Sequence, residues 1–313
     1  MINSCYICEH TDFSELSFKE MMFGFGDQFE YVRCKNCGCV QIKEIPENIG
    51  KYYPDDYYSF QEKNDGFFVN FIKNMRNSWA VFGKNIFGYS VYKIFSNPTL
   101  FSLQKLNLKK NYSILDVGCG SGDVLLSLSR LGFSSLYGID PYIKKEVYRK
   151  GLEIRKQTIF EINKEKKFDV IMMHHSLEHM DQQGSIFKVL KEILSPNGVV
   201  VIRIPLSDSW VAKEYGKNWV QADAPRHLFL HTRKSMSIIA ENSGFFVDSV
   251  VYDSTEFQFV GSIGYQKSIP LVKQKSVSFL TKAEIYRYKK KAKELNKKEI
   301  GDQACFYLKH KNE

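Results

Sequence analysis

The chain has 313 residues, and its 43% hydrophobic content is ample for one large domain with a smaller one beside it. Its formal net charge of +9 is compatible with nucleic acid, an anionic membrane surface or a phosphorylated substrate as a partner. No apolar run approaches membrane-spanning length and the N-terminus lacks a signal-peptide core, so we expect a cytoplasmic protein without a transmembrane segment.

Two Cys-x-x-Cys pairs lie in the first 45 residues: Cys5, Cys8, Cys34 and Cys37. Such pairs can place four thiolates around one Zn²⁺ in the closed tetrahedral arrangement of a structural site, and disulfides are not expected in an intracellular protein. We therefore predict a zinc-ribbon module over residues 1–45, stabilised mainly by its metal. Cys39 is a spare thiol that could replace one ligand, and reduced cysteines without metal are the alternative.

Residues 46–110 are predicted to form a loop followed by a helical cover. The loop is rich in Tyr, Pro and Asp, and we expect Tyr57 to bind substrate, with packing between modules as an equal alternative. From 66 to 108 aromatic residues recur at helical spacing with lysines opposite, which predicts two or three helices. These helices could lie on a membrane surface, but we favour a cover over the cofactor site that buries the aromatic stripe.

The stretch 114–140 predicts a strand, a glycine loop, a helix and a second strand in succession. Glycines allow the loop to turn sharply and its backbone N–H groups to approach a ligand, while the helix N-terminus favours an anionic group. Asp140 ends the second strand, where a carboxylate can accept hydrogen bonds from two ribose hydroxyls. A nucleoside ligand with a charged part is expected beyond the carboxyl ends of these strands.

The glycine spacing distinguishes between two nucleoside ligands, a dinucleotide and S-adenosylmethionine. In the dinucleotide pattern G-x-G-x-x-G, the third glycine would stand where this chain has Asp123. The run ILDVGCGSG instead resembles motif I of the class I S-adenosylmethionine-dependent methyltransferases, whose acid after the second strand matches Asp140. The resemblance implies these cofactor-binding residues: Asp116, Gly118, Cys119, Gly120, Gly122, Asp140, Pro141, Thr158, Ile159 and His174.

Residues 111–313 are predicted to form the methyltransferase domain, an α/β Rossmann-like fold. We expect a helix after Pro141 and further strands near 152–154, 168–173, 199–204, 246–252 and 304–309, with helices at 187–194 and 235–242. The resemblance implies a seven-stranded sheet whose last two strands form an antiparallel edge. An insertion at about 262–300 separates them and ends in a basic helix, which we expect to be a solvated face rather than a contact with RNA or acidic lipid.

Later segments resemble particular branches of these enzymes. FDVIMMHHSLEHM resembles motif IV of the branch that includes quinol O-methyltransferases and sugar methyltransferases, and LSPNGVVVIRIP resembles the strand that follows it. Residues 219–232 resemble a segment of methyltransferases encoded with surface-polysaccharide and deoxysugar pathways, and a zinc ribbon also precedes sugar C-methyltransferases. The resemblance implies a sugar acceptor contacted by Trp219 and Arg226, the latter holding a phosphate or carboxylate.

Methylation of a hydroxyl, or of a carbon beside a carbonyl, requires a base that removes a proton. His175, Glu178 and His179 have i, i+3, i+4 spacing, and His227 lies in a Pro-Arg-His loop. We predict His175 or His227 as the base, with Glu178 orienting a histidine. The alternative is structural, with Glu178 capping a helix and His179 packing under the sheet. A His–Glu–His metal site is conceivable but is not adopted.

The sequence thus predicts an S-adenosylmethionine-dependent methyltransferase with a structural Zn²⁺ that acts on a hydroxyl or carbon of a sugar, nucleotide-linked or in a glycan, in polysaccharide or deoxysugar biosynthesis. One alternative is an RNA methyltransferase that grips its substrate with the ribbon and the basic helix. The absence of an N/D-P-P-Y signature after the motif IV strand argues against methylation of nucleic-acid bases. The other alternative is a quinol-type small-molecule O-methyltransferase.

Overall fold

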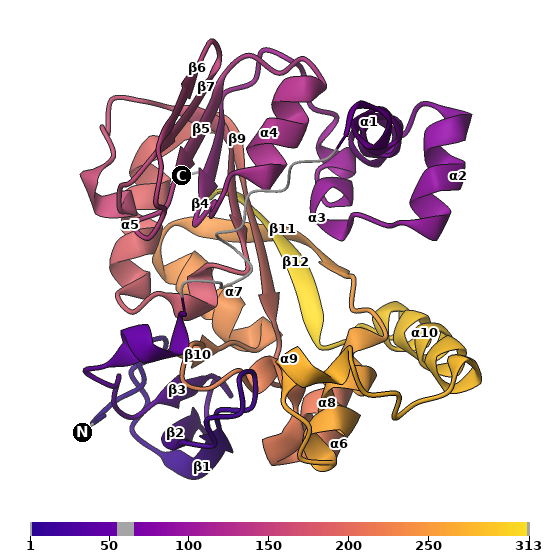
Figure 1. Cartoon of the computed structure of the whole chain (residues 1–313). Helices are drawn as coiled ribbons and strands as arrows, with labels where there is room; N and C mark the ends of the chain where they lie inside the picture. Colours follow the sequence, from indigo (N-terminus) through magenta and orange to yellow (C-terminus); the bar gives the residue numbers. More distant parts are fainter. Residues whose placement is uncertain (1, 55–65, 312–313) are drawn as a thin grey trace. The chain divides into compact units, whose positions relative to one another are not determined.

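A computed structural model describes residues 2–54 and 66–311 (Figure 1). The chain forms two compact units, and neither is continuous in sequence. The first unit comprises Met1–Pro54, His175–Lys188 and Ile202–Glu313, and the second comprises Asp55–His174 and Val189–Val201. Residues 1–45 are therefore part of a larger unit, and Tyr57 lies outside the described residues.

A small antiparallel sheet belongs to the first unit and has the strand order β1-β2-β3-β10. Its strands are β1 (Phe13–Lys19), β2 (Gln28–Cys34), β3 (Val40–Ile42) and β10 (Phe229–Leu230). Phe229 pairs with Gln41 and Leu230 with Val40, although they are far apart in the chain. Strand β10 therefore attaches the N-terminal strands to the later part of the same unit.

The main sheet has eight strands in the order β11-β12-β9-β8-β4-β5-β7-β6. Their bounds are β4 (Ile114–Val117), β5 (Leu136–Ile139), β6 (Val147–Arg149), β7 (Leu152–Arg155), β8 (Phe168–His174), β9 (Leu194–Pro205), β11 (Phe245–Tyr252) and β12 (Gln303–His310). Strand β4 pairs in parallel with β5 and β8, and β5 with β7, whereas β11 and β12 are antiparallel. The predicted α/β class and the antiparallel edge are confirmed.

Strand β6 lies where a helix was expected after Pro141, so this prediction was wrong. Residues 141–146 form turns and bends, and β6 then pairs antiparallel with β7. Only two residues connect these strands, and Gly151 among them has φ of 78°. A Cβ atom at this position would lie 2.8 Å from the carbonyl oxygen of Ser134. Glycine at this turn thus permits a tight hairpin, which adds an eighth strand to the seven expected.

The helices predicted within 66–108, after the glycine loop, near 187–194 and 235–242 and in the basic segment are confirmed, whereas the helix Trp210–Tyr215 was not predicted. The helices of the described chain are α1 (Phe67–Phe82), α2 (Ile86–Ile94), α3 (Pro98–Phe101), α4 (Asp123–Arg130), α5 (Gln183–Ile193), α6 (Trp210–Tyr215), α7 (Arg233–Asn242), α8 (Phe257–Gln266), α9 (Leu271–Gln274) and α10 (Lys282–Lys297). Short 3₁₀ turns lie at Ile49–Tyr52, Gln104–Leu106, Ile159–Glu161, Leu177–His179, Gly216–Asn218 and Val220–Ala222. Among the described helices, none is both long and apolar enough to cross a membrane.

Helices α1 and α2 form a hairpin in the second unit, and its core is aromatic. Trp79 packs against Tyr89, Tyr92 and Phe101. The outer aromatic residues of the predicted stripe are instead exposed: Phe67, Phe68, Phe71, Phe87 and Phe95. The prediction that the stripe is buried was therefore wrong for these five residues, whereas Trp79, Phe82 and Tyr92 are half-buried. Gly88 contacts Met75 and Trp79, so α2 crosses α1 over its second half and leaves its first turn uncovered.

Candidate functional site

The four predicted zinc ligands come together in the first unit. The sulfur atoms of Cys5, Cys8, Cys34 and Cys37 all lie within 4.8 Å of one another, with Cys5–Cys37 at 3.6 Å and Cys8–Cys34 at 3.5 Å. Zn–S bonds in a tetrahedral site imply S–S separations of about 3.8 Å. The thiols therefore fit a structural Zn²⁺. Cys39 stands apart from this group, and its thiol faces the carbonyl oxygen of Val40.

Strand β2 ends at the second cysteine pair, where a tight turn is fixed by contacts with α7. Gly38 has φ of 74°, and its N–H donates to the carbonyl of Cys34. The hydroxyl of Thr232, the residue that caps α7, donates to the carbonyl of Cys37 at 2.6 Å. A Cβ atom on Gly38 would lie 2.9 Å from the Thr232 methyl. The turn that presents two of the thiols is thus built against a helix of the same unit.

The glycine loop of the second unit connects β4 to α4. All three of its glycines have positive φ: Gly118, Gly120 and Gly122. The N–H groups of Gly118 and Cys119 donate to the carbonyl of Ile139, and that of Gly120 donates to the carboxylate of Asp140. These N–H groups therefore hold the loop against the end of β5, although we expected them to approach a ligand.

Two buried carboxylates accompany this loop. Asp140 accepts the N–H of Tyr142 at 2.8 Å through Oδ1 and that of Gly120 at 3.0 Å through Oδ2, which leaves lone pairs for a diol. Burial raises the pKa of Asp140, although both hydrogen bonds oppose this. Burial and the charge of Asp140 raise the pKa of Asp116 to about 7. A cationic ligand would stabilise both carboxylates, which fits the sulfonium and ammonium groups of S-adenosylmethionine.

The other predicted cofactor residues stay predictions, although the structure fixes their surroundings. The N–H and hydroxyl of Thr158 both donate to Glu161 at 2.7 Å, which caps the turn that contains buried Ile159. Pro141 follows Asp140 in the turn after β5. His174 is the half-buried last residue of β8.

A cluster of histidines surrounds Glu178 in the first unit, directly after β8. Glu178 is completely buried, and its Oε1 accepts a hydrogen bond from His175 Nδ1 at 3.1 Å. The Nε2 of His175 lies 2.8 Å from the guanidinium of Arg203, which can only donate. His175 is therefore a neutral ring with its single lone pair already used. This argues against His175 as the base.

His227 has a different hydrogen-bond pattern. Its Nδ1 lies 2.8 Å from the carbonyl oxygen of Gln221, so Nδ1 carries the proton and Nε2 the lone pair. This Nε2 lies 4.0 Å from Oε1 of Glu178 and 3.8 Å from Oδ2 of Asp223. Two carboxylates thus face the atom that would gain a proton, and they would stabilise the resulting imidazolium.

The charges of this cluster follow from burial and from its neighbours. Burial alone would raise the pKa of Glu178, but the hydrogen bond from His175 and the nearby imidazoles lower it to about 2. Burial and His227 lower the pKa of His179 to about 4, so this ring is neutral near pH 7. Glu178, His179 and His227 have donor atoms within 4.8 Å of one another, so they also suit a metal that binds nitrogen and oxygen.

Arg226 and Trp219, which we expected to contact substrate, make internal contacts. The guanidinium of buried Arg226 donates to Glu20 at 3.0 Å and to Asp223 at 2.6 Å. The indole N–H of buried Trp219 donates to Asp302 at 3.0 Å. Their polar groups are therefore engaged within the first unit, and we assign them a structural role instead of the expected substrate contact.

Three residues in and around this cluster were not predicted from the sequence: Glu20, Arg203 and Asp223. Arg203 interrupts an apolar strand, and this pattern could have marked it as a buried charge with a partner; its Nε donates to Asp253 at 2.6 Å. Glu20 accepts four backbone N–H groups of residues 22–25, besides the guanidinium of Arg226. Nothing local to Glu20 signals that its partner lies 206 positions later.

The family model described as a methyltransferase domain matches residues 89–250, which is just over half of the chain. The chain belongs to this family. The matched part is therefore an S-adenosylmethionine-dependent methyltransferase domain, and it includes the glycine loop, Asp140 and the histidine cluster.

Sequence relatives of this methyltransferase are named ubiquinone biosynthesis O-methyltransferases. The protein from Bradyrhizobium diazoefficiens is 28% identical over 38% of this chain and 52% of its own length. The protein from Pasteurella multocida is 32% identical over 33% of this chain and 51% of its own length. The chain thus spans about half the length of these curated relatives. Among solved structures, the cyclopropane synthase MmaA2 from Mycobacterium tuberculosis aligns with 75% of this chain and 97% of its own, with 15% identity and a TM-score of 0.44.

Proposed function

We propose that this methyltransferase transfers a methyl group from S-adenosylmethionine to a hydroxyl oxygen of a quinol-type small molecule, with His227 as the general base. The observation that carries the proposal is the hydrogen bond from Nδ1 of His227 to the carbonyl oxygen of Gln221, which leaves Nε2 as the basic nitrogen, 4.0 Å from Glu178 and 3.8 Å from Asp223. The names of the sequence relatives support the choice of oxygen as the acceptor atom.

In the proposed reaction S-adenosylmethionine supplies an electrophilic methyl group, and the electron pair of the broken C–S bond stays on sulfur. His227 Nε2 takes the hydroxyl proton as the C–O bond forms. Glu178, which is ionised because its pKa is about 2, stabilises the imidazolium. His175 and Arg203 act through Glu178, because together they fix the orientation of its carboxylate.

Acidity favours a phenolic over a sugar hydroxyl. A phenol has a pKa near 10, and a sugar hydroxyl is less acidic still, so a neutral imidazole is better matched to the phenol. The sugar acceptor predicted from the sequence receives no support from the relatives, and its two expected anchors, Trp219 and Arg226, are engaged internally. We therefore favour the quinol-type alternative over the sugar and over RNA.

The proposal extends to the two ligands that the chain would hold. The second unit would bind S-adenosylmethionine, with its ribose hydroxyls at Asp140. The four clustered thiols would bind one structural Zn²⁺.

The test uses the full chain with S-adenosylmethionine and two acceptor panels, catechols and quinols in one and nucleotide sugars in the other, with the gain of one methyl group read by mass spectrometry. We expect methylation in the first panel.

The role of His227 is tested by substitution. His227→Gln should lower kcat about 100-fold or more while leaving the affinity for S-adenosylmethionine unchanged.

A buried histidine outside the cluster provides the control. His231 has both ring nitrogens in hydrogen bonds, to Ser235 and Gln183, and we assign it no proton transfer. His231→Gln should keep kcat within a few fold if its fold is intact. Equal kcat for wild type and His227→Gln would remove His227 from the mechanism, and methylation of nucleotide sugars alone would replace the proposed acceptor.

A further inference from the structure

We propose that the hairpin of α1 and α2 docks on an anionic phospholipid surface. Its exposed apolar side chains would enter the interface between headgroups and acyl chains, and basic residues in and beside a groove of the second unit would face the phosphates. This inference goes beyond the proposed function and does not depend on which acceptor is methylated.

The apolar part consists of two short runs at the surface of one hairpin. The first turn of α1 exposes Phe67, Phe68, Val69 and Phe71, and the α2 segment exposes Ile86, Phe87, Ile94 and Phe95. Phe67 is 90% exposed and Ile86 is 83% exposed. Single exposed apolar residues are normal in proteins, but eight within 29 positions of two neighbouring helices mark an interaction surface.

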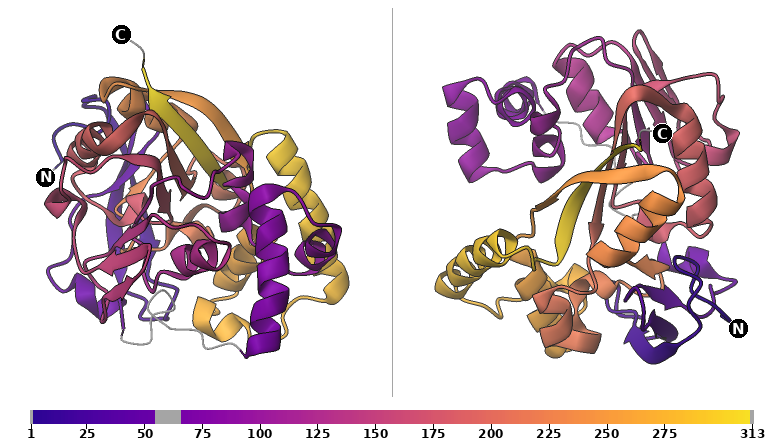
Figure 2. Two further views of the ribbon diagram at one scale, coloured as in Figure 1. Left: turned by 90° about the horizontal axis from the view of Figure 1, so that it is seen from above. Right: turned by 180° about the vertical axis from the view of Figure 1, so that it is seen from behind.

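The hairpin geometry explains why α1 and α2 leave several of these residues without cover from each other. Figure 1 shows α1 end-on and α2 from the side, and the left view of Figure 2 shows the reverse, so their axes cross at a wide angle. Crossing helices cover each other only near the contact, which Gly88 places at Met75 and Trp79. The first turn of α1 and the last turn of α2 therefore project beyond it, whereas Ile86 and Phe87 lie next to Gly88 at the contact and are nevertheless exposed.

The charge of the segment that contains the hairpin indicates which kind of partner it binds. Between Asp65 and Asp116 the sequence has seven Lys and Arg residues and no Asp or Glu. A basic segment with aromatic side chains is typical of helices that lie on anionic lipid, where both contributions add. Pairing with a second copy would bring two such positive surfaces together, which argues against self-association. Nucleic acid would satisfy the charge, but the aliphatic residues of both runs have no role in base stacking.

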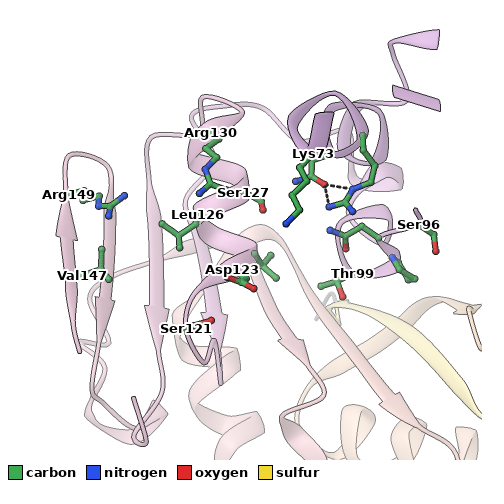
Figure 3. Close-up of a pocket in the computed structure, with 15 residues that line it drawn as sticks. Lys73, Ser96, Thr99, Ser121, Asp123, Leu126, Ser127, Arg130, Val147 and Arg149 are labelled. Carbon is green, nitrogen blue, oxygen red and sulfur yellow. Dashed lines mark hydrogen bonds between the residues drawn. The ribbon is translucent and has the colours of Figure 1, made fainter. Parts of the chain in front are cut away.

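A basic groove adjoins the hairpin within the second unit (Figure 3). It encloses about 540 Å³ between α1, the segment 96–99, α4 and strand β6. Four basic side chains line it: Lys73, Arg76, Arg130 and Arg149. Asp123 is the acidic member of the lining. The view shows Lys73 on α1 and Arg130 on α4 across the groove from each other, an arrangement that suits a phosphate.

The test is flotation of the full chain with vesicles of phosphatidylcholine alone and of phosphatidylcholine with 30% phosphatidylglycerol (about this fraction gives a strongly anionic surface). We expect binding to the anionic vesicles only, and weaker binding as salt rises. The variant Phe67→Ser/Phe68→Ser should bind at least about tenfold more weakly, because two interfacial side chains are lost. Lys73→Gln/Arg130→Gln should lose binding to a similar extent.

Helix α10 offers the matched control, because it is also basic and exposes Tyr286. Tyr286→Ser should bind vesicles as the wild type does. Cooperative thermal unfolding and unchanged affinity for S-adenosylmethionine would show that each variant is folded. The proposal is overturned if the wild type ignores anionic vesicles, if the Phe67/Phe68 variant binds them undiminished, or if these substitutions abolish instead a dimer or binding to RNA.

Discussion

Asp223 in the first unit and Asp116 in the second have opposite electrostatic surroundings. In the first unit, burial would raise the pKa of Asp223, but the charge and hydrogen bond of Arg226 lower it to about 2. In the second unit, Asp116 lies in β4 with the charge of Asp140 nearby, and its pKa rises to about 7. The charge of Asp223 is therefore compensated by Arg226, whereas the surroundings of Asp116 are suited to a cationic ligand.

Asp116→Asn should stabilise the ligand-free protein at pH 8. The pKa of Asp116 is about 7 in the folded state, against an ordinary value of 3.8. At a pH between these two values, the folded state keeps a proton that the unfolded state has lost. The contribution of Asp116 to the free energy of unfolding therefore falls as pH rises from about 4 to about 7. At 1.36 kcal/mol per pH unit, full ionisation costs at most about 4 kcal/mol.

The measurement is urea unfolding of wild type and Asp116→Asn at pH 5 and pH 8 after removal of bound nucleoside. The stabilisation by the amide should be clearly larger at pH 8 than at pH 5. If the difference in the free energy of unfolding between Asp116→Asn and the wild type is the same at both pH values, the raised pKa of Asp116 is contradicted.

At the scale of elements, the small sheet and the cysteine cluster support each other. Cys34 is the last residue of β2, and β3 begins at Val40, directly after the second cysteine pair. Strand β3 in turn pairs with β10, and Thr232, two residues after β10, binds the cysteine turn. A metal that fixes the thiols would therefore also fix the strand pairing of the first unit.

Cys8→Ser should remove bound zinc and lower the midpoint of thermal unfolding by at least about 5 °C, because one of four ligands is lost and the metal contributes to folding. Elemental analysis of the purified protein should give one zinc per chain for the wild type and much less for the variant. Cys39→Ser is the matched control, with a neighbouring buried thiol outside the cluster, and it should retain the metal. Loss of zinc in Cys39→Ser but not in Cys8→Ser would show that Cys39, and not Cys8, is a ligand of the metal.

At the scale of the whole molecule, local patterns could be predicted from the sequence and distant contacts could not. Apolar runs such as 114–117 and 168–173 identified strands β4 and β8, whereas the cofactor site that the glycine loop between β4 and α4 predicts stays a prediction. Amphipathic spacing identified α1 and α2. It did not predict what packs against them, because periodicity shows which side of a helix is apolar but not which segment covers that side. The short β6 was missed because a three-residue strand has almost no periodicity.

The partners of the histidine cluster were missed for a related reason, which is separation along the chain. Glu20 and Arg226 form a buried ion pair across 206 positions, and Tyr31 donates to the carbonyl oxygen of His227 across 196. Single-sequence patterns describe a window of a few turns, so such pairs leave no local trace. The same contacts explain why the first compact unit is assembled from three separate segments.

Removal of residues 1–45 should therefore prevent the first unit from folding. The fragment 46–313 would lose β1, β2 and β3, leave β10 without its sheet, and leave Arg226 without Glu20. Breaking a buried ion pair by removal of one partner alone costs about 3–5 kcal/mol, which is a large part of the stability of a domain. We expect the fragment to show no cooperative thermal transition by near-ultraviolet circular dichroism, whereas Glu20→Gln in the full chain should unfold cooperatively at a lower temperature. A fragment that unfolds as cooperatively as the full chain and binds S-adenosylmethionine equally well would show instead that the zinc-ribbon segment is an independent module.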